Sequence, residues 1–213
     1  MRAFAAISGI RDDRRARPGT DVCIDGYPRS GNTWTVRAFR TWNPEASVAH
    51  HMHVPGQIRA AVRLGVPTGV VVRPPQEVVV SLIVWTDGQL PPRAALWSYA
   101  WFHRQLLGLT DGIVVCRFAD VVDDPGLAVS ALNARFGTRF HRGAIDDEFR
   151  RGLTADLEAM STDLNADPGR QAGVPSPERE AMKREVAESV AAHPWLPRAE
   201  AAYERLLSVA DPR

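Results

Sequence analysis

A short apolar segment, a loop with two glycines and an amphipathic helix follow one another near the N-terminus. The apolar segment is 22–24, the glycines are Gly26 and Gly31, and the helix pattern runs from Asn32 to Trp42. A strand, a glycine loop and a helix in this order direct backbone N–H groups and a helix N-terminus at a phosphate group. The segment therefore predicts a phosphate-binding loop at the carboxyl end of a parallel strand.

The cation of this loop does not stand where an ATPase places it. Four residues separate the two glycines, which is the spacing of a Walker A loop, but Asn32 follows the second glycine in place of lysine. The nearest cation is Arg29, three residues earlier. Arginine offers a fixed fork of donors to an anion, so the loop is predicted to neutralise charge through a guanidinium.

Strand and helix patterns alternate along the rest of the chain. Strands are predicted at 21–25, 69–73 and 113–117, an extended segment at 50–55, and helices at 56–64, 76–87, 91–109 and 125–136. The C-terminal third is predicted to be helical, with Ser176 as the N-cap of a helix that begins at Pro177. Such alternation predicts an α/β fold of three layers, α/β/α, around a central, mostly parallel sheet, as in P-loop NTPases. The ligand crevice is expected at the carboxyl ends of the strands.

Composition restricts the partners of the chain. Its 213 residues, of which 45% are hydrophobic, predict a single domain at 21–213 after a basic N-terminal arm at 1–20. The formal net charge of +1 gives no overall field for nucleic acid, and no apolar run reaches the roughly 20 residues of a transmembrane helix. Cys23 and Cys116 fall in predicted strands and are expected to be buried thiols, which favours a cytoplasmic location.

Three segments at predicted strand ends together resemble the sulfotransferase family that uses 3'-phosphoadenosine 5'-phosphosulfate (PAPS). The octapeptide Tyr27–Trp34 resembles the family's 5'-phosphosulfate loop, commonly Tyr-Pro-Lys/Arg-Ser-Gly-Thr-Thr-Trp. Arg73, in an Arg-x-Pro segment with Ser81 eight positions on, resembles its 3'-phosphate motif. Segment 51–55 resembles the segment that carries the general base. Segment 116–125 is similar to the family's Tyr-Glu-Asp-Leu-x-x-Asp-Pro turn.

The resemblance implies a role for each of these residues. It places Arg29, His53 and Ser81 in the catalytic group. The implied nucleotide-binding residues are Arg29, Ser30, Gly31, Asn32, Thr33, Trp34, Arg73, Ser81 and Arg170. Of these, Arg73 and Ser81 would select the 3'-phosphate, and the ring of Trp34 would stack on adenine. Arg170 is the nearest counterpart of the family's C-terminal nucleotide-closing segment.

We therefore expect a PAPS-dependent sulfotransferase, with no metal, that moves a sulfuryl group to a hydroxyl or, as a second choice, an amine. The acceptor is expected to be a small molecule, a glycan or a lipid, and no signature of an oligomeric state is recognisable. Two other functions stay open: a P-loop kinase or NTPase, and a non-catalytic nucleotide-binding protein of the same fold. His51 remains an alternative base, and His50, His51 and His53 an alternative metal site. Trp85, Trp97, Trp101 and Phe102 are either core residues or a wall of the acceptor pocket.

Overall fold

The centre of the protein is a parallel sheet. A computed structural model describes residues 14–164 and 177–210. In these residues the sheet has the strand order β2-β1-β3-β4. The strands are β1 (Val22–Gly26), β2 (Val48–His50), β3 (Thr68–Val72) and β4 (Val114–Arg117), and each pairs in parallel with its neighbour. β1 and β3 are buried at every residue, as strands covered on both faces must be.

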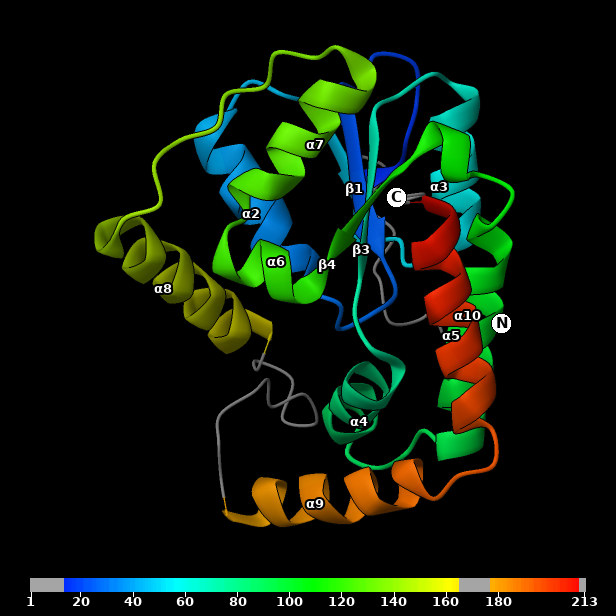
Figure 1. Ribbon diagram of the computed structural model, residues 1–213. Coiled ribbons are helices and arrows are strands. Elements are labelled where there is room, and N and C mark those ends of the chain that lie inside the picture. Colours follow the sequence, from blue (N-terminus) through cyan, green and yellow to red (C-terminus); the bar gives the residue numbers. More distant parts are fainter. Residues whose placement is uncertain (1–13, 165–176, 211–213) are drawn as a thin grey trace.

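Helices connect the strands and cover both faces of the sheet (Figure 1). They are α2 (Asn32–Trp42), α3 (Pro55–Arg63), α4 (Pro75–Trp85), α5 (Pro92–Leu106), α6 (Phe118–Asp123), α7 (Gly126–Phe136), α8 (Asp147–Leu164), α9 (Pro177–Ala191) and α10 (Leu196–Ala210), with a 3-10 turn, η2 (Thr110–Gly112), before β4. α2, α6 and α7 lie on one face, and α3, α5 and α10 lie on the other (Figure 1). The expected α/β fold with a parallel central sheet and three layers is confirmed.

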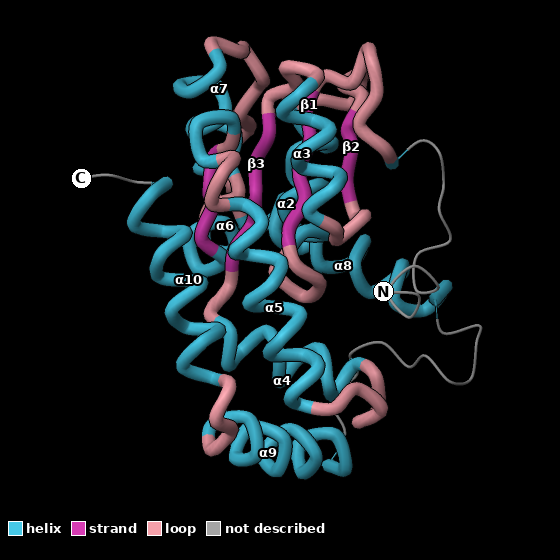
Figure 2. Tube along the Cα trace, turned by 90° about the vertical axis from the view of Figure 1, so that its right-hand side faces the viewer, coloured by secondary structure: helices cyan, strands magenta, loops and turns pink. Residues whose placement is uncertain are grey.

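The core is divided by the sheet. On one side Ile24 and Phe39 pack with Leu132 of α7. On the other side Tyr27 and Phe102 belong to a larger cluster that extends through α4, α5 and α10. α4 and α9 lie beyond the carboxyl ends of the strands, as the turned view in Figure 2 also shows. No helix in the described part of the chain is both long enough and apolar enough to cross a membrane.

The chain changes direction across the sheet at β1. From β1 it passes through α2 to β2 at one edge, and it then returns through α3, on the opposite face, to β3 on the other side of β1. In open α/β sheets, ligands bind beyond the carboxyl ends of the strands at such a reversal point. The loop that follows β1 occupies this position.

Most predicted elements are found within about three residues of their expected bounds, but the extended segment at 50–55 is wrong. β2 ends at His50, and the chain then turns sharply, with positive φ angles of 55° at His51 and 54° at His53, before α3 begins at Pro55. The helix α6 was not predicted. α9 begins at Pro177 as expected, whereas its proposed cap, Ser176, lies outside the described residues. Both cysteines are buried free thiols, as predicted.

Candidate functional site

The loop between β1 and α2 has a backbone that requires its glycines. Gly31 precedes the first turn of α2 with a φ of 90°, and Arg29 also has a positive φ, of 66°. A Cβ on Gly31 would lie 2.8 Å from the ring of Phe118, and a Cβ on Gly26 would collide with the carbonyl oxygen of Val71. The loop is therefore packed tightly against β3 and α6, with the N-terminus of α2 at its end.

Two side chains of the loop hold it in place. The hydroxyl of Tyr27 lies 2.7 Å from Ser98 Oγ and donates to the carbonyl of Ala95, 3.2 Å away, so it attaches the loop to α5. Asn32 Nδ2 donates to the Tyr27 carbonyl over 3.0 Å. Asn32, at the position of the Walker lysine, thus links the two ends of the loop by a hydrogen bond inside it. Ser30 Oγ is buried and has no hydrogen-bond partner among the described residues.

Arg29, Arg73 and Ser81 meet beside the loop, although they come from three different segments. Arg29 Nε donates to Ser81 Oγ on α4 over 3.2 Å. Arg73, directly after β3, donates from Nη1 to the carbonyl oxygen of Arg29 over 3.3 Å. Its Nε donates to Glu77 Oε2 on the first turn of α4, at 3.1 Å. The site therefore has two guanidinium groups and a hydroxyl beside the loop between β1 and α2, and Glu77 lies next to Arg73.

Phe118 is a site residue that the sequence reasoning did not identify. The guanidinium carbon of Arg73 lies 4.1 Å from the centre of the Phe118 ring, and the same ring faces Gly31. An aromatic face stabilises a nearby cation and limits its rotation. The available signal was its position: Phe118 directly follows β4, the neighbour of β3, so it reaches the same edge of the sheet as Arg73.

Trp34 and Thr33, in the first turn of α2, already have hydrogen-bond partners. The indole Nε1 of Trp34 donates to the carbonyl of Val121 on α6 over 2.9 Å. The hydroxyl of Thr33 lies 2.9 Å from Nε2 of His51. Both side chains are half-buried. The helix start is thus connected to α6 on one side and to the histidine turn after β2 on the other.

The histidine turn contains two kinds of histidine. Burial lowers the pKa of His50 and of His51 to about 3, so both are neutral at pH 7. Burial also acts to lower the pKa of His53, but the hydrogen bond and the charge of Asp25 outweigh it and raise this pKa above its ordinary value. Of the two candidate bases, His51 and His53, His53 is therefore the more basic. Its backbone and ring both contact the end of β1.

No group of three or more His, Cys, Asp or Glu side chains in the described residues is arranged to hold a metal ion. His50 and His51 are in edge-to-face contact, and Nδ1 of one ring faces Nδ1 of the other. His51 uses its second nitrogen for Thr33. The short histidine cluster is thus internally hydrogen-bonded, and it connects the turn to the first turn of α2.

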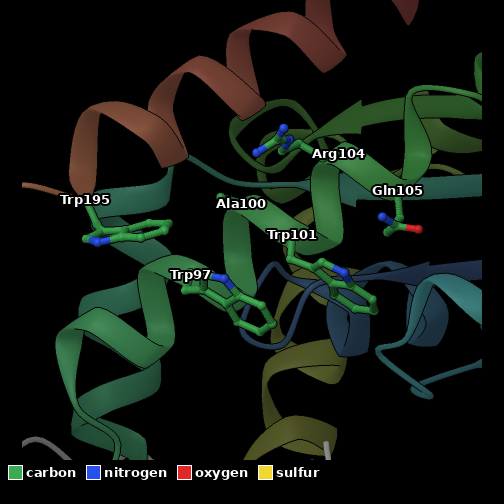
Figure 3. A pocket seen from close by; sticks show the side chains of 6 residues that line it. All are labelled: Trp97, Ala100, Trp101, Arg104, Gln105 and Trp195. Carbon is green, nitrogen blue, oxygen red and sulfur yellow. The ribbon is translucent and has the colours of Figure 1, made fainter.

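Two tryptophans of α5 are exposed to solvent. Trp97 and Trp101 are stacked, 6.4 Å between ring centres, and line a shallow hollow of about 320 Å³ with Trp195 and Arg104 (Figure 3). Phe102, by contrast, is fully buried in the core. Ala95 and Ser98, which contact Tyr27, are not among the residues that line this hollow. Of the predicted nucleotide contacts, Arg170 lies outside the described residues.

Comparisons with known proteins do not assign this site. The chain matches no model of a protein family, and a search of curated proteins found no match. The function of the site is therefore inferred from its residues and their geometry.

Proposed function

We propose that the protein is a PAPS-dependent sulfotransferase with a P-loop NTPase-like fold, and that the site beside β1 binds the donor. The observation that carries the proposal is the meeting of Arg29, Arg73 and Ser81 at one phosphate loop. A donor with phosphate groups at the 3' and 5' positions of its ribose needs two separate cationic positions. The chain supplies one in the loop and one at the end of β3.

The phosphate loop would hold the 5' end of the donor. Backbone N–H groups at the start of α2 favour an anion there, because the first turn of a helix leaves its donors without partners inside the helix. The buried hydroxyl of Ser30, which has no hydrogen-bond partner within residues 14–164 and 177–210, supports the same interpretation. Asn32 binds the loop carbonyl and carries no charge, so the cation of the loop is Arg29. This suits sulfuryl transfer better than the lysine- and magnesium-dependent hydrolysis of ATP.

Arg73 and Ser81 would select the 3'-phosphate. Arg73 is fixed by the ring of Phe118 and by the loop carbonyl, so its guanidinium is already oriented. A phosphate with two charges competes well with the single charge of Glu77, whose side chain is half-exposed to solvent. We therefore expect the 3'-phosphate to take the place of Glu77 as the partner of Arg73.

The reaction needs a base and a cation on opposite sides of the sulfuryl group. The acceptor hydroxyl loses its proton to His53 while its oxygen forms a bond to sulfur. The bond between sulfur and the bridging oxygen breaks, and the electron pair stays on the 5'-phosphate, where Arg29 stabilises the added charge. The products are a sulfate ester and 3'-phosphoadenosine 5'-phosphate (PAP). The protein contributes positioning and charge, as in phosphoryl transfer. The acceptor is proposed to be a small molecule, glycan or lipid.

Calorimetric titration tests the donor site directly. The wild-type protein is expected to bind PAP more tightly than adenosine 5'-phosphate or ATP with magnesium. Arg73→Ala should weaken PAP binding by about 10- to 100-fold, the loss typical of a charged hydrogen-bonded contact, because the 3'-phosphate loses its cation. The same variant should change adenosine 5'-phosphate binding little, since this nucleotide has no 3'-phosphate.

Arg93→Ala is the matched control, because Arg93 is an exposed arginine at the start of α5. It should bind PAP as the wild type does. An equal loss for both nucleotides in Arg73→Ala would remove Arg73 from the 3'-phosphate site. Tighter binding of ATP with magnesium than of PAP would favour a kinase or NTPase instead.

A further inference from the structure

We propose that Asp25 is the positioning residue of this site: its buried carboxylate fixes the ring of His53 so that Nε2 is the proton acceptor. The inference rests on the proposed function for the role of His53 as the base. Asp25 itself was not among the predicted site residues. It lies in β1, directly before Gly26, and its side chain has no exposure to solvent.

The carboxylate of Asp25 joins the phosphate loop to the histidine turn. Oδ1 accepts the N–H of Gly26 over 2.8 Å. Oδ2 accepts the N–H of Met52 over 3.0 Å, and the N–H of His53 lies 3.3 and 3.4 Å from the two oxygens. A charged carboxylate can remain in the interior only when its oxygens are satisfied in this way. Asp25 thus serves as a common anchor for the start of the loop and for the backbone of the base.

These hydrogen bonds also explain the unusual backbone of the turn. His51 and His53 both have left-handed φ angles, which side chains other than glycine adopt rarely. Such a conformation persists only where the surrounding structure holds it. The two N–H groups that Asp25 accepts belong to this turn, so the carboxylate holds the backbone in the conformation that brings the His53 ring to the end of β1.

The contacts of the ring determine its neutral tautomer. His53 Nδ1 lies 2.9 Å from the carbonyl oxygen of Gly26 and 3.4 Å from Asp25 Oδ1. Carbonyl and carboxylate oxygens only accept hydrogen bonds, so Nδ1 must carry the proton. The neutral ring then keeps its lone pair on Nε2, and Nε2 is the atom that can take the acceptor's proton.

Burial lowers the pKa of His53, and among the charged groups around it Asp25 has the largest influence. Asp25 attracts the imidazolium, whereas Arg14, from the segment before β1, opposes it. His51 is adjacent, with a ring-centre distance of 5.5 Å, and stays neutral near pH 7 because its own pKa is lowered. His50, whose pKa is also lowered, is neutral as well. Asp25, together with the Gly26 carbonyl, holds a proton on His53 more tightly.

NMR of the protein labelled with ¹⁵N-histidine tests the inference without any acceptor. In the wild type, the resonances that His53→Gln removes identify His53. They should show a protonated Nδ1 and an unprotonated Nε2 in the neutral ring, and a pKa above 6.5. In Asp25→Asn the pKa should fall, because the charge and one backbone acceptor are lost, while the Gly26 carbonyl still accepts from Nδ1. A merely structural role would leave the pKa unchanged.

Asp21→Asn is the matched control, since Asp21 also accepts a backbone N–H, from Ser47, but is exposed and does not touch His53. It should leave the His53 titration unchanged. If Asp25→Asn does not fold, the wild-type spectrum decides alone: a proton on Nε2 of neutral His53, or a pKa below 6.5, overturns the inference. Titration of the same sample with PAP separates the two proposals, because failure to bind PAP contradicts the donor site and leaves the Asp25–His53 arrangement intact.

Discussion

Three contacts fix the guanidinium of Arg73, and one of them competes with the proposed ligand. The Phe118 ring and the Arg29 carbonyl are neutral and can stay in place when an anion binds. Glu77 is different, because its carboxylate occupies Nε of Arg73 and would lie close to a 3'-phosphate. An ion pair of this kind, one turn apart on the surface, stabilises a protein by only about 0.3–0.5 kcal/mol. Its main effect should therefore be on binding and not on folding.

Glu77→Gln is expected to tighten PAP binding by about 2- to 10-fold, since the substitution removes a negative charge near the 3'-phosphate and keeps the shape of the side chain. The measurement is calorimetric titration at low ionic strength, where surface charges are least screened. Adenosine 5'-phosphate is the control ligand, and its affinity should stay the same. Weaker PAP binding by Glu77→Gln would mean that Glu77 supports the site by holding Arg73.

Some residues of the site could be predicted from the sequence, and others could not. Arg29 belongs to a local motif, and Arg73 directly follows a strand whose end the β-branched run marks, so each has a signal in its own segment. Phe118 and Asp25 have no such signal. Their contacts depend on which strands are neighbours, and a single sequence does not specify strand order. The raised pKa of His53 likewise depends on a carboxylate 28 positions away in the chain.

At the scale of elements, the loop between β1 and α2 depends on the backbone conformation of Gly31. Its φ of 90° is unfavourable for other residues, and its Cα faces the ring of Phe118. Gly65 has a similar positive φ of 68° but open space around it. The two glycines therefore separate the cost of the backbone conformation from the cost of close packing.

Gly31→Ala should destabilise the protein by about 2–4 kcal/mol, from the left-handed backbone together with the collision with Phe118, and should abolish measurable PAP binding. Gly65→Ala should cost only about 1–2 kcal/mol and leave PAP affinity intact. Urea unfolding and calorimetry measure the two effects. Equal destabilisation by both substitutions would show that Phe118 does not restrict the loop.

The elements themselves were predicted well where local signals are strong. Proline in the first turn marks the starts of α4 and α5, and the unbroken apolar run at 69–72 marks β3. The extended conformation predicted for 51–53 was wrong because the turn found there is imposed by hydrogen bonds to Asp25, which belongs to another strand. α6 was missed because six residues contain too few turns for a helical pattern.

At the scale of the whole molecule, buried neutral histidines make the fold sensitive to acid. Burial lowers the pKa of His103 to about 4, and that of His50 and His51 to about 3, against 6.5 in the unfolded chain. The unfolded state therefore binds more protons below pH 6.5, and stability falls as the pH decreases. His53 has the opposite shift: its contribution is complete below pH 6.5 and is lost as the pH rises through its raised pKa.

Unfolding near pH 5 should accordingly take up about three protons, which corresponds to a slope of about 4 kcal/mol per pH unit. Urea unfolding at a series of pH values between 7 and 5 measures this slope. His103→Gln should reduce the uptake by about one proton. Stability that is constant over this range would contradict the assignment of neutral, buried histidines.

The three-layer architecture was predictable because the alternation of strands and helices leaves few ways to bury both faces of a parallel sheet. The order of the strands was not predictable, since α2 and α3 could connect strands that are arranged in more than one order in the sheet. That order places β1 at the reversal point and gathers residues from the ends of β2, β3 and β4 around the start of α2.

The attachment of Tyr27 to α5 has a thermodynamic consequence. A loop already held by Tyr27, Asn32 and Asp25 loses little conformational entropy when it closes around an anion. Binding should then resemble the docking of two rigid bodies, with a heat-capacity change set by the surface that the nucleotide itself covers. The affinity of the site would thus depend mainly on the positions of its charged groups. Folding of the chain around the ligand would contribute little.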